Sequence, residues 1–212
     1  GRTGRILSFR LKYETMTSVQ PSSYRTAASA TKDNGSTGQC YHIIAGYAPT
    51  TAHTNAECEE YYDELEEHIA EKRQNDILII AADCNANVGI KRSWAKHKPA
   101  SQACLGNHGN GRKNERGARL LDFCFEHQLV IASTCFEKKY YNTWTSTLGN
   151  GRGYQLDHFL VQRCDMQHVV DCGHMQTPLC NSDHTGIKLT LQARGSPRTG
   201  CINADTRKSE KY

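Results

Sequence analysis

The clearest pattern of hydrophobic and polar positions lies between residues 54 and 83. Thr54 and Glu57 have the spacing of a helix capping box, and apolar residues then recur at helical intervals. These apolar positions are Cys58, Tyr61, Tyr62, Leu65 and Ile69. From Asp76 to Asp83 a continuous apolar run ends in a carboxylate, as is typical of a strand buried on both faces. The segment therefore predicts an amphipathic helix followed by a central strand.

Weaker patterns predict the remaining elements. Alternation favours strands at residues 5–11 and 24–31, and the turn signal Asp33-Asn34-Gly35 ahead of Tyr41–Tyr47 predicts a hairpin. A second helix is expected from about Asn114 to His127, with a core-facing side made of Leu120, Leu121, Cys124 and Phe125. Further strands are expected at Leu129–Thr134, Thr143–Ser146, Tyr154–Val161 and Gly186–Leu191. Because the helices punctuate a larger number of strands, the predicted class is α/β or α+β with layered sheets.

The chain is long enough for one domain with a real core. Its 212 residues are 37% hydrophobic and 23% charged, as is typical of a soluble globular protein. We expect the domain to span residues 1–192 and a polar tail or linker, with Gly, Pro, Ser and scattered charge, to span 193–212. No apolar run approaches the roughly 20 residues that cross a bilayer, and no signal peptide is visible. No membrane partner is therefore expected, and the sequence leaves the oligomeric state open.

The ten cysteines predict free thiols. Several lie inside apolar stretches, as Cys40, Cys84 and Cys124 do, where a free cysteine behaves as a small buried hydrophobe. With no secretion signal, this favours a reduced, intracellular chain, with the nucleus as one candidate compartment. Residues 164–184 also gather cysteines and histidines, namely Cys164, His168, Cys172, His174, Cys180 and His184. They contain no Cys-x-x-Cys pair, whereas structural zinc ligands are normally two to four residues apart, so zinc is not expected.

The net charge of +4 is unevenly distributed along the chain. Residues 55–73 contain eight acids and only Lys72 and Arg73 as bases. Residues 90–119 contain eight bases and only Glu115 as an acid, and most of them fall in a long predicted loop over residues 86–113. One face that repels a polyanion and another that attracts it would suit a nucleic-acid binder. Ordinary solvated surfaces with blocks of like charge are the alternative.

Polar residues stand at the ends of three predicted strands. Asp83 and Asn85 follow the central strand, Asp157 interrupts an apolar strand, and Asp183-His184 precedes the last strand. Taken singly, a turn explains the first pair and a cap explains the last. A buried Asp157 needs a partner, for which a histidine is suitable. Together, carboxylates, an amide and a histidine fit phosphodiester hydrolysis with a divalent cation.

Six motifs in order make the chain similar to a known family. They are Gly46-Tyr47-Ala48-Pro49-Thr50, residues 79–88 (IIAADCNANV), residues 114–136 (NERGARLLDFCFEHQLVIASTCF), Thr143-Trp144-Thr145-Ser146, Gln155-Leu156-Asp157-His158 and Ser182-Asp183-His184. Over roughly residues 5–192, the chain resembles the endonuclease/exonuclease/phosphatase superfamily, in particular non-LTR retrotransposon endonucleases and craniofacial development protein 2-like proteins. The resemblance implies a DNase I-like β-sandwich flanked by helices.

The resemblance also implies a role for each matching residue. Asp183 would be a ligand of a Mg²⁺ or Mn²⁺ ion or a carboxylate close to it. His184, oriented by Asp157, would contact the scissile phosphate, and Asp83 would handle the proton of the water or leaving group. Asn85 and Tyr47 would place phosphate oxygens. The DNA-contacting residues would be Arg112, Lys113, Arg116 and Trp144, although burial of Trp144 in the core is the alternative.

The chain departs from the family at several positions. Ala82, Cys84 and His158 stand where the family has Gly, Phe and Tyr. Family members also begin with a strand carrying an Asn and a strand carrying a metal-binding Glu, and nothing before Tyr47 matches either. We therefore expect a domain that is incomplete at its N-terminus and impaired in catalysis.

Three functions remain as hypotheses at this point. The first is a Mg²⁺-dependent endonuclease that acts on DNA and derives from a retroelement. The second is a catalytically inactive remnant that at most binds nucleic acid through its basic loop. A lipid phosphatase on the same fold is disfavoured, because the segments 114–117 and 143–146 resemble the retroelement type.

Overall fold

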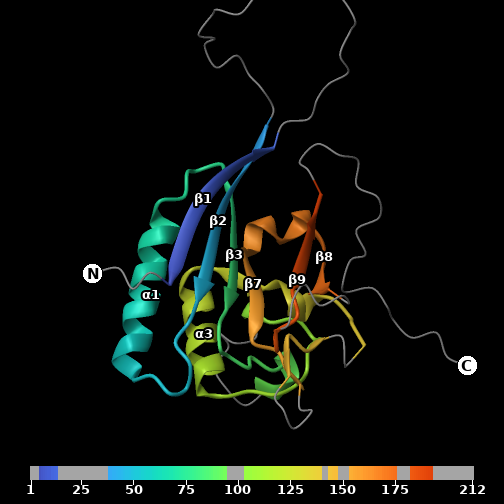
Figure 1. Ribbon diagram of the computed structural model, residues 1–212. Helices are drawn as coiled ribbons and strands as arrows, with labels where there is room; N and C mark the ends of the chain where they lie inside the picture. The colour runs from blue at the N-terminus through green and yellow to red at the C-terminus, as the bar shows by residue number, and fades with distance from the viewer. Residues whose placement is uncertain are drawn as a thin grey trace, which may run out of the picture.

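The centre of the molecule is a five-stranded mixed sheet (Figure 1). The computed structural model describes residues 5–13, 38–94, 103–139, 143–147, 153–175 and 182–192. The strands lie in the order β1 (Ile6–Tyr13), β2 (Gln39–Tyr47), β3 (Ile77–Asp83), β7 (Asp157–Gln162) and β4 (Leu129–Ile131). The β2 and β3 strands run parallel, and the other neighbouring pairs are antiparallel.

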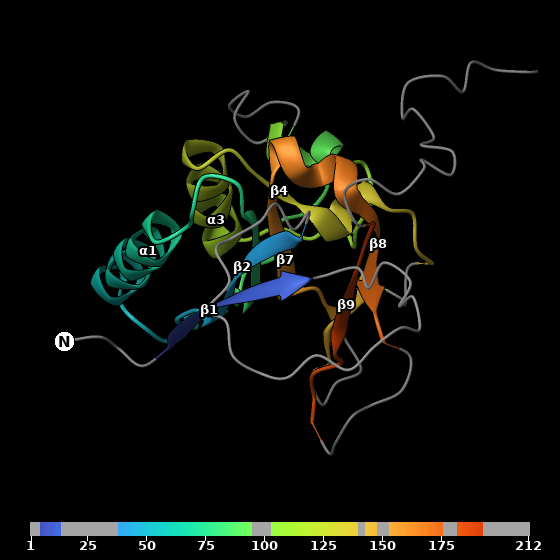
Figure 2. The same ribbon diagram turned by 90° about the horizontal axis from the view of Figure 1, so that it is seen from above.

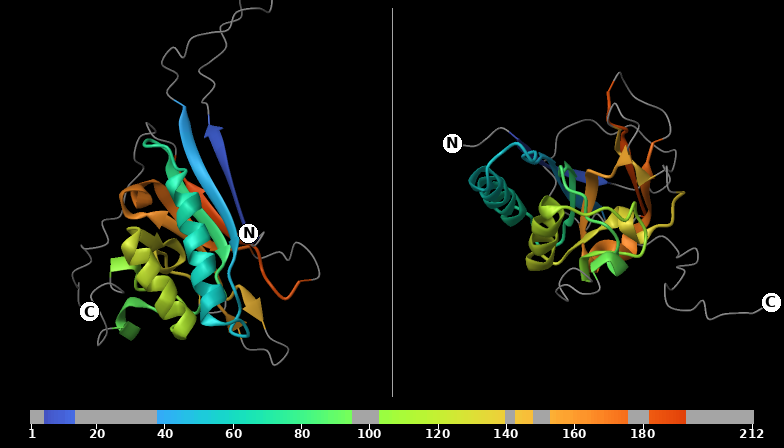
Figure 3. Two further views of the ribbon diagram at one scale, coloured as in Figure 1. Left: turned by 90° about the vertical axis from the view of Figure 1, so that its left-hand side faces the viewer. Right: turned by 90° about the horizontal axis from the view of Figure 1, so that it is seen from below.

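The two faces of this sheet are covered differently, as the views in Figures 2 and 3 show. The helices α1 (Asn55–Ala70) and α3 (Glu115–Glu126) pack on one face. The two-stranded sheet of β8 (Val169–His174) and β9 (Ile187–Leu191) lies against the other. Smaller elements complete the described chain: β5 (Ser146–Thr147), β6 (Gly153–Tyr154) and the 3-10 helices η1 (Lys91–Trp94), η2 (Ala132–Cys135) and η4 (Arg163–His168). The predicted layered α/β class is confirmed, with a second sheet of only two strands among these residues.

Both predicted helices form, and their caps explain where they begin. The Thr54 side chain accepts a hydrogen bond from the Glu57 amide at 3.2 Å, and the Glu57 carboxylate accepts one from the Thr54 amide at 2.8 Å. This capping box satisfies donors that α1 leaves unpaired at its start. At the start of α3, the Asn114 side chain accepts from the amides of both Gly117 and Asn87. One side chain therefore caps α3 and fixes the segment that follows β3.

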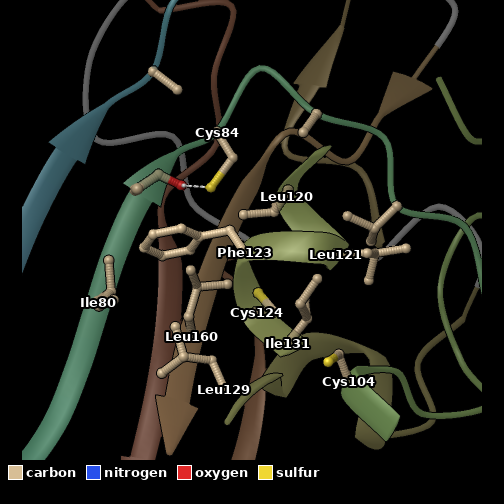
Figure 4. Packing of buried hydrophobic residues seen from close by; sticks show 14 of the residues in the cluster. Ile80, Cys84, Cys104, Leu120, Leu121, Phe123, Cys124, Leu129, Ile131 and Leu160 are labelled. Atoms are coloured by element: carbon tan, nitrogen blue, oxygen red, sulfur yellow. Dashed lines mark hydrogen bonds between the residues drawn. The ribbon is translucent and has the colours of Figure 1, made fainter. Parts of the chain in front are cut away.

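The β3 strand is buried on both faces, as its sequence predicts. Leu78 and Ile80 belong to the core on the helix side, where Ile80 lies near Phe123 of α3 and Leu160 of β7 (Figure 4). On the opposite face, Ile77 and Ile79 pack with Leu189 and Leu191 of β9. Full burial of one such side chain stabilises the fold by about 1.5–3 kcal/mol.

Cysteines contribute to both layers of the core. Cys84, Cys104, Cys124 and Cys172 are buried free thiols, whereas Cys40 is only half-buried. Burial raises the pKa of Cys104 to about 11 and that of Cys172 to about 12. Cys164 is exposed on η4, and Cys180 lies outside the described residues. The expectation of buried cysteines is therefore confirmed for Cys84 and Cys124 and is wrong for Cys40.

Several predicted boundaries were wrong for identifiable reasons. The strand expected at Leu129–Thr134 ends at Ile131, because the Thr134 hydroxyl donates to the Ile131 carbonyl at 2.7 Å and closes a 3-10 turn. The strand expected over Tyr154–Val161 is interrupted at residues 155–156, and in the described part of 143–146 only Ser146 is in a strand. Phe125 is 49% exposed, and its neighbour Phe123 occupies the core instead.

The sequence pattern also failed to predict one strand and one buried acid. The β8 strand was not predicted, because its central residues mix Val170, Asp171 and Gly173 without clear alternation. The amphipathic pattern of the first helix places its acids on the outer side, but Glu64 is buried. The predicted strand at 24–31, the turn at 33–35 and the tail at 193–212 lie outside the described residues.

We predict that Gly117→Ala destabilises the fold by about 1–3 kcal/mol, because a methyl group there would overlap the Asn87 carbonyl. This steric cost exceeds the gain of roughly 1 kcal/mol that Ala normally brings to a helix. Urea denaturation measures the change, with Glu126→Ala at an exposed position of α3 as the control. A Gly117→Ala chain as stable as the control would contradict this close approach.

Candidate functional site

A row of polar side chains crosses the end of the main sheet. Tyr47 at the end of β2 pairs with Asp83 at the end of β3, and Asp83 pairs with Asp157 at the start of β7. Side chains at paired positions share a face, and side chains alternate along a strand. Asp83 therefore lies on the same face as Ile79, the face that packs against β9. The strand register alone thus brings three of the predicted site residues together.

His184 joins this row from the other layer. It precedes β9 and forms an isolated bridge with Ser146 of β5. Its Nδ1 atom lies 3.0 Å from Oδ2 of Asp157, and both side chains are mostly buried. The expected approach of these two residues is therefore observed. The contact fixes the ring so that Nε2 is the atom left to meet a ligand.

Thr145 holds both members of this pair, and the sequence analysis assigned it no role. Its hydroxyl accepts hydrogen bonds from the amides of Leu156 and Asp157 at 2.9 and 3.0 Å. Its carbonyl accepts from the amide of Thr185, next to His184, at 2.8 Å. Thr145 is 3% exposed, so these bonds lie away from water. In the sequence, Thr145 was marked only as part of the motif Thr143-Trp144-Thr145-Ser146. The structure shows that its hydroxyl and carbonyl accept the hydrogen bonds that position Asp157 and His184.

Asp83 and Asn85 form a tight turn directly after β3. The Asn85 amide donates to Oδ1 of Asp83 at 3.0 Å, and Asn85 has a φ of 47°, in the left-handed region that asparagine tolerates. The Asn85 side chain donates to the Ala48 carbonyl at 2.8 Å, which ties this turn to the end of β2. The turn that was the alternative explanation for these residues is present, and it also directs Asp83 toward Asp157.

The surroundings of Asp83 disfavour its negative charge. Burial raises the pKa of its carboxyl, and the nearby carboxylates of Asp157 and Asp183 raise it further. The hydrogen bond from the Asn85 amide and the charge of His184 act in the opposite direction without reversing the shift. A buried carboxylate whose pKa is raised, with other carboxylates close by, is an arrangement that a bound cation would stabilise.

The donor atoms are suitably placed to hold such a cation. Asp83, Asp157 and His184 each offer one atom, and these atoms lie within 4.8 Å of one another. Carboxylate oxygens are the donors that Mg²⁺ and Mn²⁺ prefer, so the residues fit the implied metal. Asp183, which the resemblance made the metal ligand, is exposed and does not belong to this group. It lies near enough to influence the pKa of Asp83.

The predicted DNA-contacting residues lie in several environments. Arg112 stacks over the ring of Tyr154 at 5.0 Å, beside the β5–β6 pair that contacts His184. Lys113 is exposed and lies over the ring of Trp94. Arg116 donates to the His53 carbonyl at 2.8 Å. Of these three residues, Arg112 is the one whose neighbours link it to the site.

Trp144 is half-buried and packs against Gly153, where a methyl group would overlap the indole ring. This close packing favours the structural alternative for Trp144. His158, at a family position that usually carries Tyr, is fully buried, and its Nε2 lies 2.9 Å from the Ala86 carbonyl. Trp144 and His158 therefore both contribute to the packing around the site.

The acidic helix α1 touches the end of the basic segment 90–119. Arg119 of α3 forms two hydrogen bonds with the Glu59 carboxylate of α1, at 2.8 and 2.7 Å. This pairing lowers the pKa of Glu59 and neutralises part of the basic charge counted in the sequence. The two segments meet because α1 and α3 pack on the same face of the sheet. Net charge along a sequence therefore overstated the separation of charge in space.

We predict that Asp83→Asn increases the free energy of unfolding at about pH 7. An acid whose pKa is raised by folding binds its proton more tightly when folded, so its charge costs stability as the pH rises through that pKa. The gain should be smaller at about pH 4 than at about pH 7, because the charged fraction of Asp83 falls as the pH falls. Urea denaturation at both pH values tests this, with Asp63→Asn on the exposed side of α1 as the control. A loss of stability at neutral pH would contradict the charge argument.

We predict that Thr145→Val destabilises the fold by about 2 kcal/mol, because it leaves two buried amides without an acceptor. Thr145→Ser keeps the hydroxyl and should stay close to the wild type. The Val variant should also broaden or shift the NMR signals of the His184 ring, which a purely distant packing change would leave in place. If the Val and Ser variants had the same stability and the same His184 signals, Thr145 would not position His184.

The chain is similar in sequence to two curated proteins. No protein-family model matches it. Over 161 residues it is 30% identical to craniofacial development protein 2 of Tragulus javanicus and to that of Bos taurus. Each match covers 74% of this chain and 26% of the relative, so the chain spans about a quarter of the length of these relatives. Among the described residues, no helix is both long enough and apolar enough to cross a membrane.

Two solved structures of nucleases have a partly similar arrangement. The endonuclease domain of TRAS1, a telomere-specific non-LTR retrotransposon, has a TM-score of 0.49 at 15% identity, over 73% of this chain and 59% of that chain. An AP endonuclease from Archaeoglobus fulgidus has a TM-score of 0.49 at 14% identity, over 71% of this chain and 61% of that chain. The relatives in sequence and the ordered motifs support the resemblance of this chain to the endonuclease/exonuclease/phosphatase superfamily.

Proposed function

We propose that this site hydrolyses phosphodiester bonds of DNA with the help of Mg²⁺ or Mn²⁺, and that the chain derives from a retroelement endonuclease. The observation that carries the proposal is the Asp157–His184 contact beside Asp83, three side chains whose donor atoms lie within 4.8 Å. The kinship in sequence supports the same chemistry, since the family acts on phosphate esters. The retroelement origin rests on the resemblance of the motifs.

The residues present can divide the work of hydrolysis among them. A cation held by the carboxylates would neutralise phosphate charge and lower the pKa of a bound water. Asp157 holds the His184 ring through Nδ1, so that Nε2 can donate to a phosphate oxygen. Asp83, whose pKa is raised by burial, is suited to accept or return a proton. The half-exposed Tyr47 stands next to Asp83 in the register and can donate to another phosphate oxygen.

Arg112 and Lys113 supply positive charge for the DNA backbone in this proposal, and Arg116 adds charge nearer α1. Contacts of this kind position a duplex without reading its sequence. They also release counterions, so affinity should fall as salt increases. We propose Asp183 as an outer residue that attracts the cation, since it is exposed and influences Asp83.

The strength of the cation site limits the expected rate. No Glu belongs to the group of potential ligands in the described part of the chain. Mg²⁺ dehydrates reluctantly and is commonly held by only one or two carboxylates, so each of them matters. We therefore propose that this chain cleaves DNA slowly and only at high metal concentration.

The prediction is that the chain nicks supercoiled plasmid with millimolar Mg²⁺ or Mn²⁺, and that Asp157→Asn and His184→Ala each lower the rate about 100-fold or more. Asp63→Asn, an exposed carboxylate on α1, is the matched control and should keep the wild-type rate. EDTA should abolish nicking. Residual activity that is identical in Asp157→Asn and the wild type would assign the cleavage to a contaminant.

The alternative function is a chain that binds nucleic acid without cleaving it. Its motivation is the same missing ligand, together with Arg112 and Lys113, which do not depend on a metal. The two functions separate when binding and nicking are measured on the same samples. Salt-sensitive binding that persists in Asp157→Asn, with no nicking by the wild type at any metal concentration, would favour the alternative.

A further inference from the structure

Arg112 carries a positive charge that no carboxylate of the described residues neutralises. Its guanidinium carbon lies 5.0 Å from the centre of the Tyr154 ring, and within the described part of the chain the guanidinium group forms no ion pair and donates no hydrogen bond. By contrast, Arg119 of the same basic segment is paired with Glu59. The partly exposed Arg112 side chain therefore keeps its donors for an anion that belongs to another molecule.

The backbone of Arg112 is fixed as well as its side chain. Its amide donates to the Asn110 side chain at 3.0 Å. The next residue, Lys113, forms an isolated bridge with Val88, in the segment that follows β3. The guanidinium group thus starts from a defined position, so less conformational freedom is lost when it binds a ligand.

Tyr154 connects Arg112 to the site. In the β5–β6 pair, Tyr154 lies opposite Ser146, and Ser146 forms the isolated bridge with His184. Paired residues point to the same face, so the ring of Tyr154, with Arg112 over it, and the ring of His184 share a face. The Tyr154 carbonyl also accepts from the amide of Thr145 at 2.7 Å. Backbone pairing therefore fixes the two rings relative to each other.

The same register sets the spacing between the two rings. Neighbouring strands lie about 4.8 Å apart, so the backbones at Tyr154 and His184, on either side of Ser146, are separated by roughly 10 Å. A single phosphate group is too small to contact residues at both positions. One DNA strand carries a phosphate for about every 3.4 Å along the helix axis, so a second phosphate within about two or three nucleotides of the first is in reach.

We propose that Tyr154 is a positioning residue, which holds Arg112 against a second phosphate of the same DNA strand that His184 contacts. This inference rests on the proposed function and adds a residue and a phosphate subsite to it. A guanidinium group suits the task, because it is always charged and its planar fork donates two parallel hydrogen bonds to a phosphate. The aromatic ring beneath it favours one orientation of this fork.

Binding of a fluorescently labelled duplex in EDTA tests the proposal without cleavage. Tyr154→Leu removes the ring and should weaken binding about three- to tenfold, whereas Tyr154→Phe keeps the ring and should retain the wild-type affinity. Arg112→Gln should reduce the slope of log affinity against log salt by about 0.9, the contribution of one phosphate contact.

Circular dichroism and urea denaturation verify that each variant is folded. Arg112→Gln changes a partly exposed side chain, so the salt slope decides the matter even if Tyr154→Leu does not fold. An unchanged slope in Arg112→Gln, a folded Tyr154→Leu with wild-type affinity, or a wild type that does not bind the duplex would each overturn the proposal.

A double-mutant cycle shows whether Tyr154 acts through Arg112. In the Arg112→Gln background, Tyr154→Leu should have no further effect on affinity, because the side chain that it positions is gone. In the Lys113→Gln background it should keep its full effect, since Lys113 lies over the ring of Trp94 instead. Losses of the same size in both backgrounds would give Tyr154 a purely structural role.

The choice of strand has its own readout. On a single-stranded oligonucleotide, Arg112→Gln should still reduce the salt slope, by about 0.7. An effect of Arg112→Gln that is seen on the duplex alone would place its phosphate on the opposite strand and contradict the proposed subsite.

Nicking kinetics separate this inference from the proposed function. In a wild type that nicks plasmid, Tyr154→Leu should raise KM about three- to tenfold and leave kcat within about twofold, because a phosphate away from the cleaved bond is bound equally in the substrate and in the transition state. A lower kcat with an unchanged KM would overturn the positioning role. A wild type that binds DNA with the expected dependence on Arg112 but does not nick would refute the hydrolysis alone.

Discussion

The register of β3 between β2 and β7 is the constraint on which the site depends. Because side chains alternate along a strand, a slip of one residue would turn Asp83 toward the helices and Ile80 toward β9. The apolar residues on both faces of β3 prevent such a slip, since each set fits a different layer of the core. The hydrophobic packing that stabilises the fold is therefore also what aligns Tyr47, Asp83 and Asp157.

The layer of β8 and β9 adds His184 to the residues that the register of β3 aligns. His184 comes from a segment between β8 and β9, and Thr145 bonds to the backbone beside both His184 and Asp157. These bonds join three segments that are distant in the sequence, and they lie in an interior where each lost partner is costly. The site is thus assembled from local turns whose relative positions are fixed by a buried hydroxyl.

Much of this arrangement could be predicted from the sequence, and the exceptions have physical causes. The helix after Thr54 and the strand ending at Asp83 were predictable, because capping and burial leave local patterns. The ends of β4 and β7 were not, because the turns that end or interrupt them use the Thr134 and Thr145 hydroxyls, which contact residues elsewhere in the chain. The Asp157–His184 pair was predictable from the need of a buried carboxylate for a partner, whereas the exposure of Asp183 depends on the layers around it. Its role as a metal ligand was implied by resemblance and stays a prediction.

The buried thiols have a consequence for how the molecule opens. Alkylating reagents attack thiolates, and burial holds the pKa of Cys172 near 12 and raises that of Cys84 and Cys124. Cys84 and Cys124 belong to the cluster beneath the helices, and Cys172 belongs to the cluster between β8 and the main sheet. Each thiol therefore becomes reactive only when its own layer separates. Alkylation of Cys172 alone would report separation of the β8–β9 sheet from the main sheet. Alkylation of Cys84 and Cys124 as well would report unfolding of the core beneath the helices.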